Sequence, residues 1–486
     1  MAQTRERPKP VLHPDFCKGC GRCIESCPKH CIEAGTEIDG ATGLIPVQLR
    51  LDSCNGCSLC LEACPEPYGL DHESPEPRSS EPPHIPGTEN LVAIAAKRRV
   101  AETIPDVRVP MPALRPLVVK GTYASAIGAL LAGCRHFFGY PITPSTDGAE
   151  LMAKLLPELE GHFVQAVSEV ATINHMYGTG GAGLRCMTFT SSPGFSLMLE
   201  GLSYMIGAEI PGVVVDVMRA GPGLGNIGPE QGDIKIACRG PGHGTTQTLV
   251  YAPATPQEML DLTMLAFDKA FEYRNPVLVA CDGYLGQITG RVDLPSYMVK
   301  PGLPDWAVWG DAAHRPNLHT SILLNEADQE AHNVKLLAKY AQMIDREQRA
   351  DLYETDDADV LIVAANTPAR TAKGAVAVLR KQGIKAGLFR PITLWPFPIR
   401  ALAPVLPRMK AVVVVEASNG QLEDELRLAL SHADLHAPPP ITNVRHYGGI
   451  MPQMNEIVAC ARAAHEATPS RRTRETEAEA AARVLS

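Results

Sequence analysis

Two short cysteine runs near the start of the sequence hold the residue types and spacing that point most directly to chemistry. Both follow the pattern C-x2-C-x2-C-x3-C-P, as CKGCGRCIESCP and CNGCSLCLEACP. Three thiolates at this spacing can hold one face of an iron–sulfur cubane, while the fourth cysteine points away and ligates the other cluster. The duplicated run therefore predicts two 4Fe–4S clusters on one small segment.

Because the fourth cysteine of each run ligates the cluster of the other run, each predicted ligand set combines both runs. One cluster is expected on Cys17, Cys20, Cys23 and Cys64, and the other on Cys54, Cys57, Cys60 and Cys27. Zinc or disulfides are the alternative interpretation, which two complete copies with both prolines argue against. Cys31 has no place in this pattern, and we interpret it as a buried thiol.

Composition limits the classes of protein to which the chain can belong. Its 486 residues suggest about three domains at ~150 residues each, and 45% hydrophobic residues can build sizeable cores. The formal net charge of −9 gives nucleic-acid binding no overall electrostatic support. The other five of the 14 cysteines are scattered, which is typical of a reducing compartment without disulfides. With no apolar signal-peptide region and no run near the roughly 20 apolar residues of a membrane span, a cytoplasmic protein is expected.

Changes of composition along the chain mark its expected organisation. Residues 73–90 are rich in Pro, Ser and Glu and indicate a linker, and a short basic helix is expected near 93–100. From about Leu117 the pattern is α/β: apolar strands alternate with helices, which predicts parallel sheets covered on both faces. The expected segments are a two-cluster domain at 1–75, a linker at 76–115, an α/β domain at 116–295, a connecting arm with a polar helix at 296–355, a second α/β domain at 356–465 and a charged tail at 466–486.

The expected strands are short apolar runs, and the helices between them carry apolar residues near helical spacing. The strands are expected at 136–142, 163–167, 185–190, 211–220, 276–283, 358–366, 384–392 and 410–418. The helices are expected at 122–133, 170–183, 193–210, 255–275 and 367–383. One helix start is specified closely, because Thr255 and Glu258 have the spacing of a capping box.

Two charged residues follow expected strands and could act on a ligand. Glu169 opens a helix after the strand at 163–167, and its alternative role is that of a partly exposed helix-start acid beside the helix dipole. Arg219 ends the strand at 211–220, and its guanidinium suits bidentate binding of a carboxylate, with a structural salt bridge as the alternative. The glycine-rich loop that follows has no P-loop lysine, so it is a weak signal by itself.

Six longer runs carry a resemblance that covers about residues 120–457. They are GYPITPST, SEVATINHMYG, TSSPGFSLMLEG, DVMRAGPGLGNIGPEQGD, YRNPVLVACDGYLGQ and GLFRPITLWPFP. In these runs the sequence resembles the alpha subunit of 2-oxoacid:ferredoxin oxidoreductases, thiamine-diphosphate enzymes that make acyl-CoA, and most of all their branched-chain (3-methyl-2-oxobutanoate) branch. A two-cluster ferredoxin segment, usually a separate subunit there, looks fused in front. The resemblance implies a pyrimidine-type thiamine-enzyme domain at 116–295 and a transketolase C-terminal-like domain at 356–465.

The resemblance also implies roles for individual residues. Glu169 matches the carboxylate that hydrogen-bonds N1′ of the cofactor's aminopyrimidine and so favours loss of the C2 proton. Thr143 matches a residue that helps hold the substrate carboxylate, and Arg219 would act on the same group. Three residues before Thr143 are expected beside the cofactor: Tyr140, Pro141 and Ile142. The alternative for this loop is an ordinary strand-to-helix turn with Ser145 as the N-cap.

Partner subunits are implied by a motif that this sequence lacks. Thiamine enzymes hold the diphosphate through Mg²⁺ with a GDG motif and a later Asn, whereas the nearest run here is CDGYLGQ. The resemblance therefore implies that the Mg²⁺–diphosphate half lies on a beta subunit, with a gamma subunit completing a dimer of hetero-oligomers. CoA would be the co-substrate, and an external ferredoxin or other low-potential carrier the acceptor. The run RPITLWPFP could be an interface or a loop on the CoA side.

The expected reaction is oxidative decarboxylation of a 2-oxoacid to acyl-CoA and CO₂, with the electrons leaving through the clusters. The same chemistry on 2-oxoglutarate or an aryl glyoxylate such as phenylglyoxylate is one alternative. A pocket for a second carboxylate needs a further Arg or Lys, for which Arg239 is a candidate with a structural role as the alternative. A different alternative is an electron-transfer adaptor without catalytic residues of its own.

Overall fold

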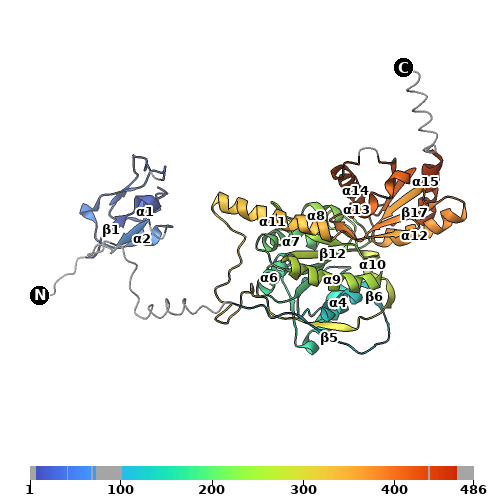
Figure 1. The fold of residues 1–486 in the computed structure, drawn as a ribbon. Coiled ribbons are helices and arrows are strands. Elements are labelled where there is room, and N and C mark those ends of the chain that lie inside the picture. The colour runs from blue at the N-terminus through green and yellow to red at the C-terminus, as the bar shows by residue number, and fades with distance from the viewer. Residues whose placement is uncertain (1–6, 41, 67–68, 73–100, 436–437, 468–486) are drawn as a thin grey trace, which may run out of the picture. The chain divides into compact units, whose positions relative to one another are not determined.

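A computed structural model of the protein describes residues 7–40, 42–66, 69–72, 101–435 and 438–467 (Figure 1). Its contacts divide the chain into two compact units, Met1–Arg98 and Arg99–Ser486. The helix expected near 93–100, most of the expected linker and nearly all of the expected tail lie outside the described residues. Across the described ranges, no helix combines the length and the apolar character that a membrane crossing requires.

The first unit contains the same small arrangement twice. In each half a short 3-10 turn precedes a cysteine run and a one-turn helix lies inside it: η1 (Pro14–Phe16) with α1 (Arg22–Ser26), then η2 (Leu51–Ser53) with α2 (Leu59–Ala63). Two antiparallel pairs close the unit: β1 (Pro10–Leu12) with β4 (Leu70–His72), and β2 (Ile32–Glu33) with β3 (Gln48–Leu49). The core is small, and two of its buried residues, Cys23 and Cys60, belong to the cysteine runs.

The second unit is built on a seven-stranded sheet with the order β18-β11-β12-β10-β9-β7-β8. Its strands are β7 (His136–Gly139), β8 (His162–Gln165), β9 (Cys186–Thr190), β10 (Gly212–Met218), β11 (Leu249–Tyr251), β12 (Pro276–Asp282) and β18 (Thr393–Trp395). All neighbours pair in parallel except β18, which is antiparallel to β11. Every residue of β10 and β12 is buried, as expected for apolar strands with helices on both faces of the sheet.

Helices cover this sheet and connect its strands (Figure 1). They are α4 (Gly121–Leu131), α5 (Thr146–Leu155), the turn η3 (Pro157–Leu159), α6 (Glu169–Gly181), α7 (Ser192–Gly207), α8 (Ile234–Arg239), α9 (Pro256–Tyr273) and α10 (Gly283–Gln287). Small residues bring α4 close to α9, since a Cβ on Gly128 would lie 2.6 Å from the Leu260 carbonyl oxygen. Helix α9 starts as expected, with the Thr255 side chain accepting from the Glu258 amide at 3.1 Å.

A second sheet of five strands follows, in the order β15-β17-β16-β19-β20. Its elements are β15 (Ala350–Tyr353), β16 (Val360–Ala364), α12 (Asn366–Lys381), β17 (Ala386–Pro391), α13 (Ile399–Leu402), η4 (Leu406–Arg408), β19 (Ala411–Glu416), α14 (Gln421–His432), β20 (Ile441–Arg445) and α15 (Met454–Ala467). Strand β18 leaves this region and joins the edge of the first sheet. The run RPITLWPFP is therefore buried between two sheets of the same chain, with Trp395 in the core.

Three further pieces complete the second unit. Strand β5 (Val107–Pro110) pairs with β14 (Tyr297–Lys300), and β6 (Leu117–Lys120) pairs with β13 (Thr289–Val292), both antiparallel. The polar helix expected in the connecting arm is α11 (Glu326–Arg346), which Asn325 caps by accepting from the amides of Ala327 and Asp328. The predicted α/β class is confirmed by these sheets and helices.

Candidate cluster sites and candidate active site

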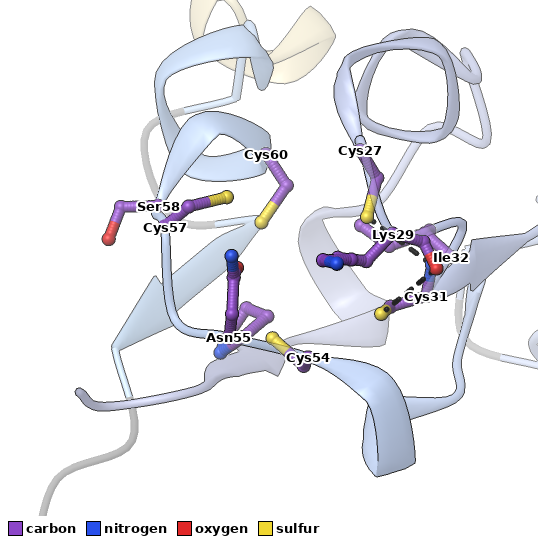
Figure 2. A pocket seen from close by; sticks show the side chains of 10 residues that line it. Cys27, Lys29, Cys31, Ile32, Cys54, Asn55, Cys57, Ser58 and Cys60 are labelled. Atoms are coloured by element: carbon purple, nitrogen blue, oxygen red, sulfur yellow. Dashed lines mark hydrogen bonds between the residues drawn. The ribbon is translucent and has the colours of Figure 1, made fainter. Parts of the chain in front are cut away.

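The cysteine runs of the first unit surround two separate pockets. One pocket is lined by Cys17, Cys20, Cys23 and Cys64, and the other by Cys27, Cys54, Cys57 and Cys60. Figure 2 shows the second pocket, where the sulfurs of Cys54, Cys57 and Cys60 face a common space with Cys27 across from them. The last cysteine of each run thus lines the pocket of the other run, which is the crossing that the spacing predicts.

Backbone geometry explains how each run wraps its pocket. Cys27 and Cys64 are the C-cap residues of α1 and α2 and have extended backbone, so each leaves its own helix at the end of the run. Gly19 and Gly56 precede the second cysteine of each run with φ of 65° and 66°, and a Cβ there would lie 2.2 Å from Ile45 O and 2.6 Å from Arg7 Cβ respectively. Glycine is required at both positions, because the backbone is left-handed and a side chain would collide with a neighbouring segment.

The chemistry of the two pockets fits iron–sulfur clusters. Burial raises the pKa of the Cys23 thiol to about 11 and also raises the pKa of the Cys60 thiol, so a thiolate there needs positive charge beside it. Iron supplies that charge. Backbone amides already point at two sulfurs, because Val47 N donates to Cys17 Sγ at 3.5 Å and Cys31 N donates to Cys27 Sγ at 3.3 Å.

In the second unit, the candidate active-site residues all follow parallel strands at the same edge of the sheet. Thr143 lies after β7, Glu169 after β8 and Arg219 after β10. The chain passes from β7 outward to β8 and then back to β9 on the other side of β7. Such a switch point opens a crevice at the carboxyl ends of the strands, where α/β proteins bind ligands.

Arg219 connects three segments at this crevice. Its side chain is 8% exposed, and it donates from Nη1 to the Thr143 carbonyl at 2.8 Å and from Nη2 to the Leu224 carbonyl at 3.1 Å. Its Nε is buried without a partner. Within the described part of the chain it forms no salt bridge, so its contacts there are hydrogen bonds to backbone carbonyls. Its remaining N–H donors are available to a carboxylate.

Glu169 is the first residue of α6 and is buried, with 5% of its surface exposed. Glu169 is therefore a helix-start acid, as considered from the sequence, but it is buried rather than partly exposed. Its carboxylate lies against the first turn of α7, where a Cβ on Gly194 would be 2.5 Å from Glu169 Oε1. Ser168 caps α6 instead, accepting from the Ala171 amide at 3.2 Å. Among the described residues no donor reaches the Glu169 carboxylate, which leaves it free to accept from a ligand such as an aminopyrimidine.

The loop at Tyr140–Thr143 lies at the surface beside Arg219. Tyr140 is 42% exposed, and Pro141 and Thr143 are exposed while Ile142 is partly buried. Ser145 occupies the N-cap position of α5 but does not cap it, since its Oγ donates to the Ile142 carbonyl at 2.7 Å. This hydrogen bond closes the loop on itself and holds Thr143 at the mouth of the crevice.

Thr143 also lines a cavity whose other walls the sequence did not identify. The same cavity is lined by Gly283, Tyr284 and Gln287 of α10 and by Asp147 of α5. Lys120 fixes two of these residues, donating from Nζ to Asp147 at 2.9 Å and to Gln287 at 3.3 Å. A Lys at the end of β6 gave no signal by itself; Tyr284 and Gln287 lay within a recognised run but without an assigned role.

A buried acid pair behind Arg219 was also missed. Burial raises the pKa of Asp216 well above its usual range, and the Asp233 carboxyl beside it raises it further. Burial also raises the pKa of Asp233, to about 6. The Ser192 hydroxyl donates to Asp233 and accepts from the Arg219 amide at 2.9 Å, so the pair holds the backbone of Arg219 through Ser192. The signal was an Asp inside the apolar strand VVVDV.

Arg239 has a structural role. It makes a bidentate ion pair with Glu425 of α14, at 2.9 Å from Nε and 2.6 Å from Nη2. This pair joins α8 to the second sheet's helices. Arg239 is therefore already engaged and does not offer a free guanidinium to a second substrate carboxylate.

Three family models of known proteins match successive parts of the chain. Residues 9–72 match the 4Fe–4S dicluster domain, residues 127–352 match the thiamine-diphosphate-binding domain of pyruvate flavodoxin/ferredoxin oxidoreductases, and residues 358–457 match pyruvate:ferredoxin oxidoreductase core domain II. The clusters and thiamine diphosphate expected from the sequence are thus the cofactors of its matched domains.

Similar proteins point the same way. The chain is 43% identical to the ketoisovalerate oxidoreductase subunit VorB of Methanothermobacter thermautotrophicus over 70% of this chain and 96% of that subunit. It is 35% identical to the 2-oxoglutarate synthase subunit KorA of Methanocaldococcus jannaschii over 65% of this chain and 92% of that subunit.

A solved structure, the 2-oxoglutarate:ferredoxin oxidoreductase of Magnetococcus marinus with 2-oxoglutarate, coenzyme A and succinyl-CoA bound, superimposes with a TM-score of 0.64 at 27% identity. That match covers 72% of this chain and 65% of the solved chain, slightly less than two thirds of it. The relatives are named as subunits, which implies that this chain also has partner subunits. The protein is a member of the 2-oxoacid:ferredoxin oxidoreductase family, with a 4Fe–4S dicluster domain in front of its thiamine-diphosphate-binding domain.

Proposed function

We propose that this chain is the alpha subunit of an enzyme that converts a 2-oxoacid, CoA and oxidised ferredoxin to acyl-CoA, CO₂ and reduced ferredoxin. The substrate proposed is 3-methyl-2-oxobutanoate, the 2-ketoisovalerate of its relative's name. The observation that carries this choice is the 43% identity to a ketoisovalerate oxidoreductase subunit over 96% of that subunit. The crevice supports the reaction class, since Glu169, Thr143 and Arg219 all lie at the carboxyl edge of one sheet.

The residues of the crevice would have different roles, which follow from the chemistry of their side chains. Thiamine diphosphate, when bound, supplies an electron sink for decarboxylation. Glu169 would accept from N1′ of the aminopyrimidine, because its buried carboxylate has no partner among the described residues. The free donors of Arg219, with Thr143 beside it, would orient the substrate carboxylate. The surface loop with Tyr140, Pro141 and the partly buried Ile142 would border the cofactor.

Electrons would leave through clusters held by the two crossed cysteine sets. The proposed ligands are Cys17, Cys20, Cys23 and Cys64 for one cluster and Cys54, Cys57, Cys60 and Cys27 for the other. All 14 cysteines are free thiols, which suits cluster assembly in the reducing cytoplasm. An external ferredoxin or another low-potential carrier would take the electrons from this unit.

We further propose that a beta subunit holds the diphosphate through Mg²⁺ and that a gamma subunit completes a dimer of hetero-oligomers. The sequence lacks the GDG motif for Mg²⁺, and CDGYLGQ in its place forms the end of β12 and helix α10. There Asp282 caps α10 by accepting from the Leu285 amide at 3.0 Å and binds Thr367, so its carboxylate is already used.

A second candidate substrate is 2-oxoglutarate, which the 35% identity to a 2-oxoglutarate synthase subunit favours. A phenylglyoxylate dehydrogenase subunit of Aromatoleum evansii, 30% identical, raises an aryl glyoxylate as a third. The ion pair between Arg239 and Glu425 argues against 2-oxoglutarate as the substrate. The second carboxylate of 2-oxoglutarate needs a cationic partner of its own, and Arg239 is already paired.

The test is an assay of the anaerobically purified complex against a panel of 2-oxoacids, with CoA and a low-potential acceptor dye. We expect the highest kcat/KM for 3-methyl-2-oxobutanoate and no turnover by this chain alone with thiamine diphosphate and Mg²⁺. A preference for 2-oxoglutarate or phenylglyoxylate would overturn the substrate, and turnover by the isolated chain would overturn the partner assignment. A complex with clusters but no thiamine and no turnover would instead favour an electron-transfer adaptor.

A further inference from the structure

The pocket around Cys27, Cys54, Cys57 and Cys60 contains a fifth cysteine that the ligand pattern does not use. Cys31 lines the same pocket and is 2% exposed, which confirms that it is buried. Figure 2 shows its side chain between Cys27 and Cys54, beside the space that the other sulfurs face.

The chain reaches this position through a tight turn after Cys27. The His30 amide donates to the Cys27 carbonyl at 3.1 Å, and His30 has a left-handed φ of 49°. The next residue is Cys31, whose amide donates to Cys27 Sγ at 3.3 Å. Strand β2 begins directly after it at Ile32, so the backbone on both sides of Cys31 is fixed. The thiol is therefore held in place rather than left to rotate freely in solvent.

The other pocket provides an internal comparison. Its four cysteines are accompanied by Val47, Leu70 and glycines, and the described residues that line it include no fifth cysteine. The two pockets also differ at other lining residues, which are Lys29, Asn55 and Ser58 at the pocket with Cys31 and Lys18 and Glu66 at the other. The effect of the added thiol is therefore isolated by changing Cys31 alone. A thiol is a weak hydrogen-bond donor, and hydrogen bonds to cluster sulfurs are one of the factors that set a cluster's reduction potential.

We propose that Cys31 is a hydrogen-bond donor to the sulfurs of the cluster on Cys27, Cys54, Cys57 and Cys60, and that it makes this cluster easier to reduce than it would be without the thiol. The physical reason is that reduction adds negative charge to the cluster, and a donor stabilises the charged form. The Lys29 carbonyl, at 3.5 Å from Cys31 Sγ, is the competing acceptor for the same hydrogen. The inference rests on the proposed ligand sets.

Potentiometric titration of the full-length chain, followed by electron paramagnetic resonance, tests this assignment. Wild type, Cys31→Ala and Cys31→Ser would be purified anaerobically and their iron measured. We expect wild-type iron content in both variants. In Cys31→Ala the ratio of reduced to oxidised cluster at fixed potential should fall about tenfold for one cluster only, which is a shift of about 59 mV for one electron. Cys31→Ser keeps a donor and should stay within about threefold of wild type.

Cys460→Ala is the matched control, because it removes a free thiol from the other unit and should shift neither cluster. Two clusters with unchanged potentials in Cys31→Ala would overturn the proposal. Loss of one cluster's iron in Cys31→Ala would also overturn it, by making Cys31 a ligand. A wild-type chain that holds a single cluster would refute the ligand sets themselves, which is a different failure and is visible before any variant is made.

Discussion

The two compact units place their candidate chemistry in opposite ways. In the first unit, eight cysteines come from two short runs, and turns and one-turn helices bring them around their pockets. In the second unit, Thr143 and Arg219 are 76 residues apart and meet only because β7 and β10 end at the same edge of a sheet. Chemistry that depends on local spacing is readable from the sequence, whereas chemistry assembled by a sheet requires its topology.

The largest expected effect tests the crossed ligand sets. Cys64→Ala should remove the cluster that Cys17, Cys20 and Cys23 share with it and leave the other, so the iron content should fall from about eight to about four atoms per chain. Iron analysis and electron paramagnetic resonance of the anaerobic protein measure this directly. If the remaining cluster proved to be the one on Cys17, Cys20 and Cys23, the crossing would be wrong.

The next effect concerns Glu169 and the chemistry of the sheet edge. Glu169→Gln keeps the volume of this buried side chain but removes the carboxylate that we propose drives proton loss from the cofactor. We expect acyl-CoA formation by the complex to fall 10²–10⁴-fold, as is typical for a lost acid–base group, with both clusters retained. Turnover and iron should be measured on the same preparation.

Ser168→Ala is the control for that experiment, because the Ser168 hydroxyl caps the same helix by accepting from the Ala171 amide. It should cost about 1 kcal/mol of stability and leave the rate per folded enzyme near wild type. Turnover of Glu169→Gln within about threefold of wild type would remove Glu169 from the catalytic residues.

A smaller fall in activity is expected for a change at Arg219, because this residue is proposed to bind the substrate and not to transfer a proton. Arg219→Lys keeps the charge but loses the fork that contacts two carbonyls and has donors to spare. A charge-assisted hydrogen bond is worth about 1.5–3 kcal/mol, so kcat/KM for the 2-oxoacid should fall roughly 10- to 150-fold. The KM for CoA should change little. Arg239→Lys breaks a structural pair instead, and it should lower stability without this change in kcat/KM.

Particular elements show where prediction from the sequence succeeded and where it stopped. The paired runs predicted which cysteines share a pocket, and the alternation of apolar strands and helices predicted the core of both sheets. The start of α9 was predicted at Thr255, but the Glu258 side chain accepts from the Ala254 amide at 2.7 Å and also binds Arg390 of β17. The second partner lies 132 residues away, beyond any local pattern.

Strand β18 and the acid pair failed to appear in the sequence analysis for the same reason. RPITLWPFP was recognised as a run, yet its pairing with β11 joins the two sheets and depends on contacts between distant segments. Asp216 looks like an ordinary strand residue in the sequence, and only the fold brings it beside Asp233, which in turn binds Ser192. The pKa of a buried carboxyl depends on its burial and on its neighbours, and residues far away in the sequence determine both.

The smallest expected effect tests this acid pair. Both pKa values are raised in the folded state, so the pair binds protons more tightly when folded than when unfolded, where an Asp titrates near about 3.9. Stability from these protons is therefore complete below about pH 4 and is lost as the pH rises through the folded pKa values, which is about 6 for Asp233. The free energy of unfolding should fall across this window.

Asp216→Asn mimics the protonated acid and cannot ionise, so it removes the contribution of Asp216 to that fall. Its free energy of unfolding in urea, relative to that of wild type, should rise from pH 5 to pH 8 by at most about 1.4 kcal/mol per pH unit. At pH 7 the kcat of the complex should stay near wild type, because Asn still donates to Asp233 and Ser192 still holds the Arg219 amide. Asp216→Ala leaves Asp233 without this donor and should lose stability at every pH. Parallel pH profiles for wild type and Asp216→Asn would show that Asp216 does not retain a proton in the folded state.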